Sequence, residues 1–228
     1  MAYQTRGRDP LLDSTMQAAL EKRSKELLGL GLIVLGALAL ALVWSYAPTD
    51  PSLVSATDEP VQNWLGRVGA GIAAPVIMVV GFGGLGVGLV LVAWGLRFML
   101  HQGAERAVGR LIFAPIWVAL LSIYASTMVT GAEWTHSFSY GGMFGDTALS
   151  ALLNIMPVGA AFVIKTTTFV IALAVVALGF FVLGFEWSEV RAGLHFLGLG
   201  LVVLYALLLR VLGQGAALTA QGARGLGE

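Results

Sequence analysis

The order of apolar and polar positions divides the chain into long uncharged runs separated by short polar loops. The first run, Leu27–Tyr46, holds 20 residues and no charged side chain. A helix rises about 1.5 Å per residue, so roughly 20 such residues cross a hydrocarbon core about 30 Å thick. Trp44 and Tyr46 close the run with rings that favour the headgroup level of a bilayer. The pattern therefore predicts a membrane-spanning helix.

Three further runs have the length and composition of membrane spans, and they are predicted at Val76–Leu96, Leu111–Val129 and Thr166–Phe185. The second run already begins at Val68, and we expect Pro75 to divide it into an interfacial lead-in and the span itself. The segment 137–165 is predicted to be an interfacial helix or a re-entrant segment shielded by protein. We predict an all-α integral membrane protein built as a four-span helical bundle.

A fifth apolar run, Ala192–Leu209, leaves the number of spans open. Hydropathy alone favours a fifth span, which would place the two termini on opposite sides of the membrane. The flanking charges do not decide, because Arg191 precedes the run and Arg210 follows it. The tail is rich in Gly, Ala and Gln, which is typical of a flexible linker. The predicted domains are an N-terminal segment 1–26, a membrane domain 27–212 and a linker 213–228.

Composition and charge support a membrane protein and set its orientation. The chain is 57% hydrophobic and 11% charged. Thirteen basic residues balance thirteen acidic ones, so nothing indicates a nucleic-acid surface, and the absence of cysteine excludes disulfides and thiolate metal sites. Lys22, Arg23 and Lys25 precede the first span, and positive residues there mark the cytoplasmic side. We therefore predict a cytoplasmic N-terminus.

Two stretches around the first loop carry a family resemblance. Residues 45–52, SYAPTDPS, resemble the S-Y-x-P-x-D-P-S pattern that ends the first span of FtsK-type (FtsK/SpoIIIE) bacterial DNA translocases. Residues 63–70, NWLGRVGA, resemble the N-x-x-G-x-x-G-A start of the second span. The resemblance assigns a structural role to Ser45, Tyr46, Pro48, Asp50, Pro51, Ser52, Asn63, Gly66, Gly69 and Ala70. From turn chemistry, we expect Asp50 to accept hydrogen bonds from backbone N–H groups and so fix how the first span meets the second.

The resemblance implies a membrane-anchoring and assembly domain that acts in cell division and chromosome partition. Such a domain tethers a cytoplasmic ATP-driven DNA motor to the division septum of the bacterial inner membrane, and that motor is not in this chain. ATP and Mg²⁺ are implied only for the motor. The implied partners are the lipid bilayer, other division proteins of the divisome and further copies of the chain in a hexamer, without direct nucleic-acid contact. A motor that works in the cytoplasm also favours four spans, with Ala192–Leu209 lying along the inner leaflet or packed beneath the bundle.

Glycine motifs in the second run favour helix packing over nucleotide binding. Residues 81–86, GFGGLG, match G-x-G-x-x-G, but a dinucleotide site needs a strand before the motif. Inside an apolar run, glycines instead let helix backbones approach each other. We assign this packing role to Gly81, Gly84 and Gly88.

The chain is not predicted to be an enzyme, and no cofactor or metal is expected in it. A P-loop needs a lysine after a glycine-rich loop, and Lys22, Lys25 and Lys165 are the only lysines, none of them so placed. His101, His136 and His195 show no metal-ligand spacing.

Two other function classes remain as alternatives. A small polytopic transporter or channel subunit is disfavoured because the four predicted spans contain no Asp, Glu, Lys or Arg to hold an ion. An integral-membrane enzyme would need convergent polar residues near one interface. The candidate group is Glu133, His136, Tyr140 and Asp146, which we interpret as ordinary loop residues.

Overall fold

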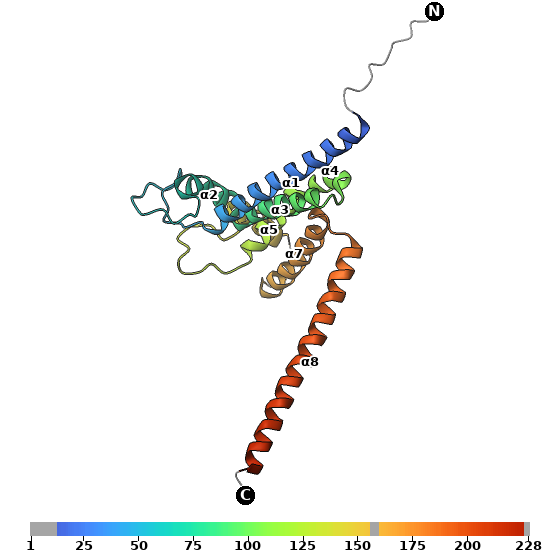
Figure 1. Cartoon of the computed structure of the whole chain (residues 1–228). Coiled ribbons are helices and arrows are strands. Elements are labelled where there is room, and N and C mark those ends of the chain that lie inside the picture. The colour runs from blue at the N-terminus through green and yellow to red at the C-terminus, as the bar shows by residue number, and fades with distance from the viewer. Residues whose placement is uncertain (1–12, 156–159, 226–228) are drawn as a thin grey trace, which may run out of the picture. The chain divides into compact units, whose positions relative to one another are not determined.

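The computed structural model of this 228-residue chain describes residues 13–155 and 160–225 (Figure 1). Within those ranges the regular secondary structure is entirely helical, which confirms the predicted all-α fold class. The chain divides into two compact units, Met1–Gly184 and Phe185–Glu228.

The apolar runs found in the sequence all lie on helices. In the described part of the chain, four helices are long and apolar enough to cross a membrane: Thr15–Trp44, Gly66–Met99, Val163–Val182 and Trp187–Leu207. A bent helix pair, Ala104–Leu111 with Ala114–Ser126, adds a fifth candidate if it forms one span. The helical-bundle prediction holds, and the choice between four and five crossings stays a prediction.

Helix α1 (Ser14–Trp44) begins well before the predicted first span. Its 31 residues correspond to roughly 46 Å, against a hydrocarbon core of about 30 Å. The additional turns carry ion pairs between Lys25 and Glu21 and between Arg23 and Glu26. Pairs spaced three or four residues apart favour a solvated helix. The polar N-terminal segment therefore continues into the first span without a break from Ser14 onward.

The second apolar run is interrupted at glycine and not at proline. It forms helix α2 (Gly66–Val80), a 3-10 turn η1 (Gly81–Gly84) and helix α3 (Leu85–Met99). Pro75 lies inside α2, so the expectation that Pro75 divides the run is wrong. A proline inside a helix removes one hydrogen bond, whereas Gly81 has a φ of 58°, a left-handed conformation that ends the helix and that glycine adopts without a steric penalty. The predicted span Val76–Leu96 covers the end of α2, the turn and most of α3.

Four glycines, Gly29, Gly36, Gly88 and Gly95, form a glycine seam along which α1 and α3 lie side by side (Figure 1). A Cβ atom added at Gly36 would lie 2.8 Å from the carbonyl oxygen of Gly88, and one at Gly29 would lie 2.6 Å from that of Gly95. Along each helix the two glycines are seven residues apart, so both close approaches fall on one line. Gly88 has the packing contact predicted for it, whereas the other three glycines were missed.

The third predicted span, Leu111–Val129, is bent near its start. The chain forms η2 (Ala104–Arg106), α4 (Ala107–Leu111) and α5 (Ala114–Ser126). The axes of the two helical segments that flank residues 112–113 differ by 54°. Pro115 lies in the first turn of α5, where its missing N–H group costs little.

Helix α6 (Gly142–Asn154) lies in the segment that the sequence left open, and it packs closely against α5. The Ser122 hydroxyl donates a hydrogen bond to the carbonyl oxygen of Gly141 at 2.5 Å. A Cβ atom at Gly141 or Gly145 would collide with Ser126 Oγ and with the Ser122 carbonyl oxygen. Residues 156–159 lie outside the described ranges, so the interfacial and re-entrant alternatives both stay predictions.

Helix α7 (Ala160–Val182) ends in three carbonyl groups that face side chains from other helices. Trp94 Nε1 donates to the carbonyl oxygen of Val182 at 2.8 Å, and Arg97 Nε donates to that of Leu183 at 3.1 Å. Arg110 Nη1 approaches the Phe181 carbonyl oxygen at 3.5 Å. The last carbonyls of a helix lack intrahelical donors, and cations near them are favourable. These contacts fix the end of α7 to α3 and α4.

The second unit contains helix α8 (Trp187–Gly225). Between Trp187 and Leu207 it has the length and composition of a span. The sequence predicted a flexible linker from Gly213, but the helix continues to Gly225. The Ala, Gln, Leu and Arg residues of this tail have high helix propensities, which outweigh the glycines that prompted the linker prediction.

Candidate functional site

Two connections of the first unit, residues 45–65 and 127–141, meet at one end of the bundle, which we call the loop end. The hydroxyl of Tyr46 in the first connection and Nε2 of His136 in the second are joined by a hydrogen bond of 2.6 Å. The two residues are 90 positions apart in the sequence. The loop end contains the stretches that carry the family resemblance, so it is the candidate functional site.

Asp50 is the buried centre of the first connection, with 2% of its surface exposed. Its carboxylate accepts hydrogen bonds from the backbone N–H groups of Gln62 at 2.7 Å and Asn63 at 2.9 Å. These are the backbone hydrogen bonds predicted from the turn chemistry. Hydrogen bonds to an ionised carboxylate are stronger than neutral ones, and they compensate the burial of the charge. Asp50 thereby fixes the segment that leads into α2.

Asn63 and Ser45 connect the end of α1 to the start of α2. Asn63 Nδ2 donates to the carbonyl oxygen of Leu42 at 2.9 Å, in the last turn of α1. Ser45 Oγ donates to the carbonyl oxygen of Ala41 at 2.6 Å and accepts from the Trp64 N–H at 3.0 Å. The final carbonyls of a helix need such external donors. The two side chains therefore cap α1 with groups that also position the next helix.

The other residues of the two motifs lie around this network. Gly66 has a φ of 65°, and Ala70 is 1% exposed. A Cβ atom at Gly69 would collide with Asn63 Oδ1, so glycine is required for the Asn63 side chain to reach its partners. Ser52 Oγ accepts hydrogen bonds from two N–H groups of the loop, at residues 54 and 55. The structure brings the motif residues together at the loop end.

Six rings form an aromatic cluster next to the Asp50 network: Tyr46, Phe82, Trp134, His136, Phe138 and Tyr140. Neighbouring ring centroids are separated by 4.7 Å for the closest pair and 6.1 Å for the widest, the range of favourable aromatic contacts. Trp134 Nε1 donates to the Phe138 carbonyl oxygen at 2.6 Å. The cluster was not predictable from the sequence because its members come from three separate segments, although aromatic residues are dense between positions 134 and 140.

The glycine at position 81 lets the second connection approach the turn between α2 and α3. The Phe82 N–H donates to the carbonyl oxygen of Tyr140 at 2.8 Å, and a Cβ atom at Gly81 would collide with that oxygen. A Cβ atom at Gly84 would lie 2.8 Å from Val76 Cγ1. The G-x-G-x-x-G stretch is thus closely packed, and its first glycine contacts a loop, whereas contact with a helix was expected from the sequence.

The four polar residues weighed as an enzyme site do not converge on one point. His136 contacts Tyr46, whereas the Tyr140 hydroxyl accepts from the Gly131 N–H at 2.8 Å. The Asp146 carboxylate accepts from the Ser139 N–H at 2.8 Å and from the Ser139 hydroxyl, and Glu133 is exposed. His136, Tyr140 and Asp146 each have a different hydrogen-bond partner, so these contacts link segments of the loop end and do not link the three residues to one another.

Burial keeps the Tyr46 and His136 pair electrically neutral near pH 7. Burial, with a smaller effect of the Asp50 charge, raises the pKa of Tyr46 to about 12. Burial also lowers the pKa of His136 below its ordinary value of 6.5. Removal from water disfavours the charged form of both groups. The contact between the two connections is therefore a hydrogen bond between uncharged partners.

A pocket of about 380 Å³ opens beside this pair. It combines hydroxyl groups and rings with aliphatic side chains, and it is lined by Tyr46, Pro48, Ser52, Val54, Ser55, Ala74, Met78, Thr135, His136 and Phe138. Leu53 at the loop tip is 87% exposed, and Val54 beside it is 58% exposed.

Comparison with known proteins gives one family over most of the chain. Residues 21–195 match the family described as the 4TM region of DNA translocase FtsK/SpoIIIE. The DNA translocase FtsK of Bradyrhizobium diazoefficiens is 32% identical over 140 residues, which cover 61% of this chain and 17% of that protein. The FtsK proteins of Azospirillum brasilense and Caulobacter vibrioides are 29% and 30% identical, over 64% of this chain and 24% and 19% of their own lengths. The chain thus spans less than a quarter of these relatives, and no solved structure matches it.

Proposed function

Because this chain belongs to the family that forms the 4TM region of FtsK/SpoIIIE DNA translocases, we propose that it anchors such a translocase in the bacterial inner membrane and assembles it at the division septum. The observation that carries the proposal is the family match over residues 21–195, which coincides with the part of the chain rich in candidate spans. In this role the chain holds a cytoplasmic ATP-driven DNA motor, and it acts by recruitment.

The loop end is the region that we assign to assembly with other division proteins. Its exposed aliphatic residues, Leu53 and Val54, lie on a loop whose base is fixed by Asp50 and its backbone partners. A rigid base with an exposed apolar tip limits the entropy lost on binding. Further copies of the chain in a hexamer and the surrounding lipids complete the proposed partners.

Imaging of a fluorescent fusion in dividing bacteria tests the recruitment proposal. We expect the chain fused to a cytoplasmic fluorescent protein to accumulate at the septum, and the double variant Leu53→Ser and Val54→Ser to lose that accumulation at unchanged membrane level. The matched control is Val108→Ser, which replaces a residue that is 82% exposed on α4, away from the loop end. Uniform membrane fluorescence of the unaltered chain would contradict recruitment by this domain.

Topology is the second testable part of the proposal. A motor that needs cytoplasmic ATP and DNA favours a cytoplasmic N-terminus and four spans, with α8 along the inner leaflet. Fusions after Glu228 of a periplasm-active phosphatase, and separately of a cytoplasm-fluorescent reporter, distinguish the two topologies. We expect fluorescence without phosphatase activity. The opposite pattern would make Trp187–Leu207 a fifth span and would place a following motor on the wrong side.

A further inference from the structure

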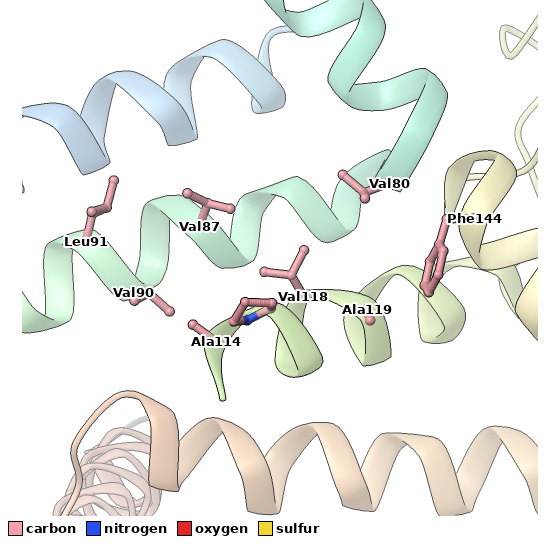
Figure 2. Close-up of a pocket in the computed structure, with 9 residues that line it drawn as sticks. Val80, Val87, Val90, Leu91, Ala114, Val118, Ala119 and Phe144 are labelled. Atoms are coloured by element: carbon pink, nitrogen blue, oxygen red, sulfur yellow. The ribbon is translucent and has the colours of Figure 1, made fainter. Parts of the chain in front are cut away.

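Two cavities of the first unit differ in chemistry. An apolar groove of about 480 Å³ lies between α3 and α5, and Figure 2 shows Val90 of α3 and Val118 of α5 directed into the space between the two helices. Its lining residues are all apolar, so the groove offers a ligand hydrocarbon contact only. The pocket of about 380 Å³ beside the Tyr46–His136 pair, which we call the loop-end pocket, is lined by polar and apolar side chains together. Because precisely placed polar groups give a pocket its specificity, the lining of the loop-end pocket restricts the class of its ligand.

Helix α2 gives the loop-end pocket an apolar wall. Ala74 and Met78 both line the pocket, and residues four apart lie on the same face of a helix. Ala74 is only 3% exposed, so this face of α2 is held within the bundle. A ligand group that packs against the wall gains stability only if it is apolar, because a polar group there would lose its hydrogen bonds to water.

The two connections contribute the polar groups of the pocket. Ser52 Oγ accepts hydrogen bonds from the N–H groups of residues 54 and 55, at 3.3 Å and 3.1 Å, so its own O–H group remains a donor. Within the described part of the chain, the hydroxyls of Ser55 and Thr135 have no hydrogen-bond partner. Among the described lining residues there is no Asp, Glu, Lys or Arg. A charged ligand would therefore lose its hydration without gaining an ion pair.

The Tyr46–His136 pair adds one donor and one acceptor, whichever partner carries the shared proton. If the Tyr46 hydroxyl donates to His136 Nε2, then Nδ1 keeps its N–H group and the phenolic oxygen can still accept. If Nε2 donates instead, the phenolic O–H group is the donor and Nδ1 is the acceptor. In both tautomers the pair thus matches a ligand that has a donor and an acceptor of its own.

Three neutral classes of ligand fit this lining to different degrees. A hydrocarbon chain would cover the hydroxyls of the two connections without replacing their hydrogen bonds to water. A saccharide carries hydroxyls around its ring, and some of them would lie against Ala74 and Met78. A peptide residue combines an apolar side chain with amide donors and acceptors, so it satisfies the α2 wall and the polar connections at once.

We propose that the loop-end pocket binds an uncharged peptide segment of another division protein, a proposal that rests on the assembly role assigned to the loop end. One aliphatic side chain of the segment packs against the α2 wall. The backbone amides of the segment exchange hydrogen bonds with the Tyr46–His136 pair and with the unpaired hydroxyls of the two connections. With a cytoplasmic N-terminus, the loop end follows the first span and the segment is extracytoplasmic. Main-chain hydrogen bonds supply affinity in such a complex, and the pocket for the side chain supplies specificity.

Binding is tested with N-acetyl-leucine N-methylamide, a neutral peptide unit, and the purified full chain in dodecylmaltoside micelles. Saturation-transfer NMR on this probe should give a dissociation constant on the order of 1 mM, as expected for a ligand of its size. Ser55→Phe places a ring in the pocket and should abolish the binding. Ala56→Phe adds the same ring at an exposed neighbouring position outside the lining and should keep it. The signal that Ser55→Phe retains measures partition of the probe into micelles.

A probe signal of equal strength from the parent chain and from Ser55→Phe would overturn the proposal. If Ser55→Phe lowers the folded yield, Thr135→Phe fills the pocket from an exposed position of the second connection and should have the same effect. Thr135→Val keeps the shape of the side chain and removes its hydroxyl, which should weaken binding about five-fold. Ser137→Ala, at an exposed position outside the lining, is the control for this change.

Two further probes test the class of the ligand. N-acetyl-lysine N-methylamide has the same peptide unit with a charged side chain, and it should bind about ten-fold more weakly or worse. N-acetylglucosamine should also bind more weakly than the leucine probe. Equal binding of the lysine and leucine probes would contradict recognition by an uncharged pocket, and tighter binding of N-acetylglucosamine would assign the pocket to a saccharide.

Imaging of the fluorescent fusion separates this proposal from the recruitment proposal. We expect Ser55→Phe to lose septal accumulation and Ala56→Phe to keep it, at equal membrane levels. If the parent chain and Ser55→Phe both accumulate at the septum, recruitment stands and the pocket is not its binding site. If the parent chain does not accumulate although the leucine probe binds, recruitment fails while the peptide chemistry of the pocket stands.

Discussion

Helix α1 meets the rest of the bundle in two regions that are held together by different forces. Along the glycine seam, the backbones of α1 and α3 approach closely because the seam glycines carry no side chain, and apolar side chains of the facing helix, such as Val92 and Ile33, pack beside them. At the loop end, the same helix is held by Asp50, Asn63, Ser45 and Tyr46 through directed hydrogen bonds. An added side chain at a seam glycine would collide with the facing helix. At the loop end, loss of a polar side chain would leave its hydrogen-bond partner unsatisfied. Substitutions that add volume should therefore destabilise the seam, and substitutions that remove a polar group should destabilise the loop end.

The largest effect is expected from added volume in the seam. Gly36→Leu places a side chain where the Gly88 carbonyl oxygen lies 2.8 Å from the new Cβ, so the two helices must move apart. We expect a loss of about 3 kcal/mol of unfolding free energy or more, and a reduced folded yield. Gly31→Leu is the control, because nothing lies within 4 Å of a Cβ there. Unfolding in mixed micelles with increasing dodecyl sulfate measures both, and equal stability of the two variants would show that the seam is not tightly packed.

Removal of the buried carboxylate at the loop end should have the next largest effect. Asp50→Ala leaves the N–H groups of Gln62 and Asn63 without their acceptor, which costs about 2–3 kcal/mol. The loop 45–65 should become sensitive to protease while the seam stays intact. Asp58→Ala, at an exposed position of the same loop, serves as the control. Unchanged stability and unchanged septal recruitment of Asp50→Ala would refute the structural role assigned to this motif.

Loss of the hydroxyl that joins the two connections should be milder. Tyr46→Phe keeps the aromatic packing but removes the hydrogen bond to His136, at an expected cost of about 1 kcal/mol. Tyr205→Phe, at an exposed position of α8, should be neutral. Thermal unfolding of the three proteins side by side measures the difference. A Tyr46→Phe variant as stable as the parent would mean that packing alone joins the connections.

Acid should weaken the loop end with the smallest effect of the four. Burial lowers the pKa of His136 below 6.5 in the folded state, so around pH 6 the unfolded chain binds more protons at this residue. Stability should therefore fall as the pH drops below about 6.5 and level off below the folded-state pKa. His136→Phe should flatten this part of the pH profile, while the contribution of the seam does not change with pH. A parent profile that is flat between pH 7 and pH 5 contradicts the neutral pair.

The sequence predicted those features that depend on local patterns. Hydropathy located the apolar helices, because a run of about 20 uncharged apolar residues satisfies its backbone hydrogen bonds in a bilayer by forming a helix. The hydrogen bonds of Asp50 followed from turn chemistry, because its partners Gln62 and Asn63 lie within the same loop. The break in the second apolar run was wrongly predicted at Pro75, which lies inside α2. A helix tolerates the one hydrogen bond that proline removes, whereas the left-handed backbone at Gly81 ends the helix.

Features that join distant segments could not be predicted in the same way. The Tyr46–His136 contact links residues 90 positions apart, and no single-sequence pattern reports such a pair. The seam left a weak signal, because Gly29 with Gly36 and Gly88 with Gly95 repeat every seven residues. That signal becomes specific only when the antiparallel pairing of α1 with α3 is known. The helical tail of α8 was missed because glycine content was given more weight than the propensity of the intervening residues.

The contacts at the end of α7 have a mechanical consequence. Any tension along the chain from α8 reaches the first unit through the peptide bond after Gly184, directly next to the three held carbonyls. Three consecutive carbonyl oxygens, those of residues 181 to 183, are contacted by the side chains of Trp94, Arg97 and Arg110. A pulling force is therefore shared among three contacts that would have to break together. In the tethering role proposed above, a pull from an attached motor would reach α3 and α4 through this junction before α7 could unravel.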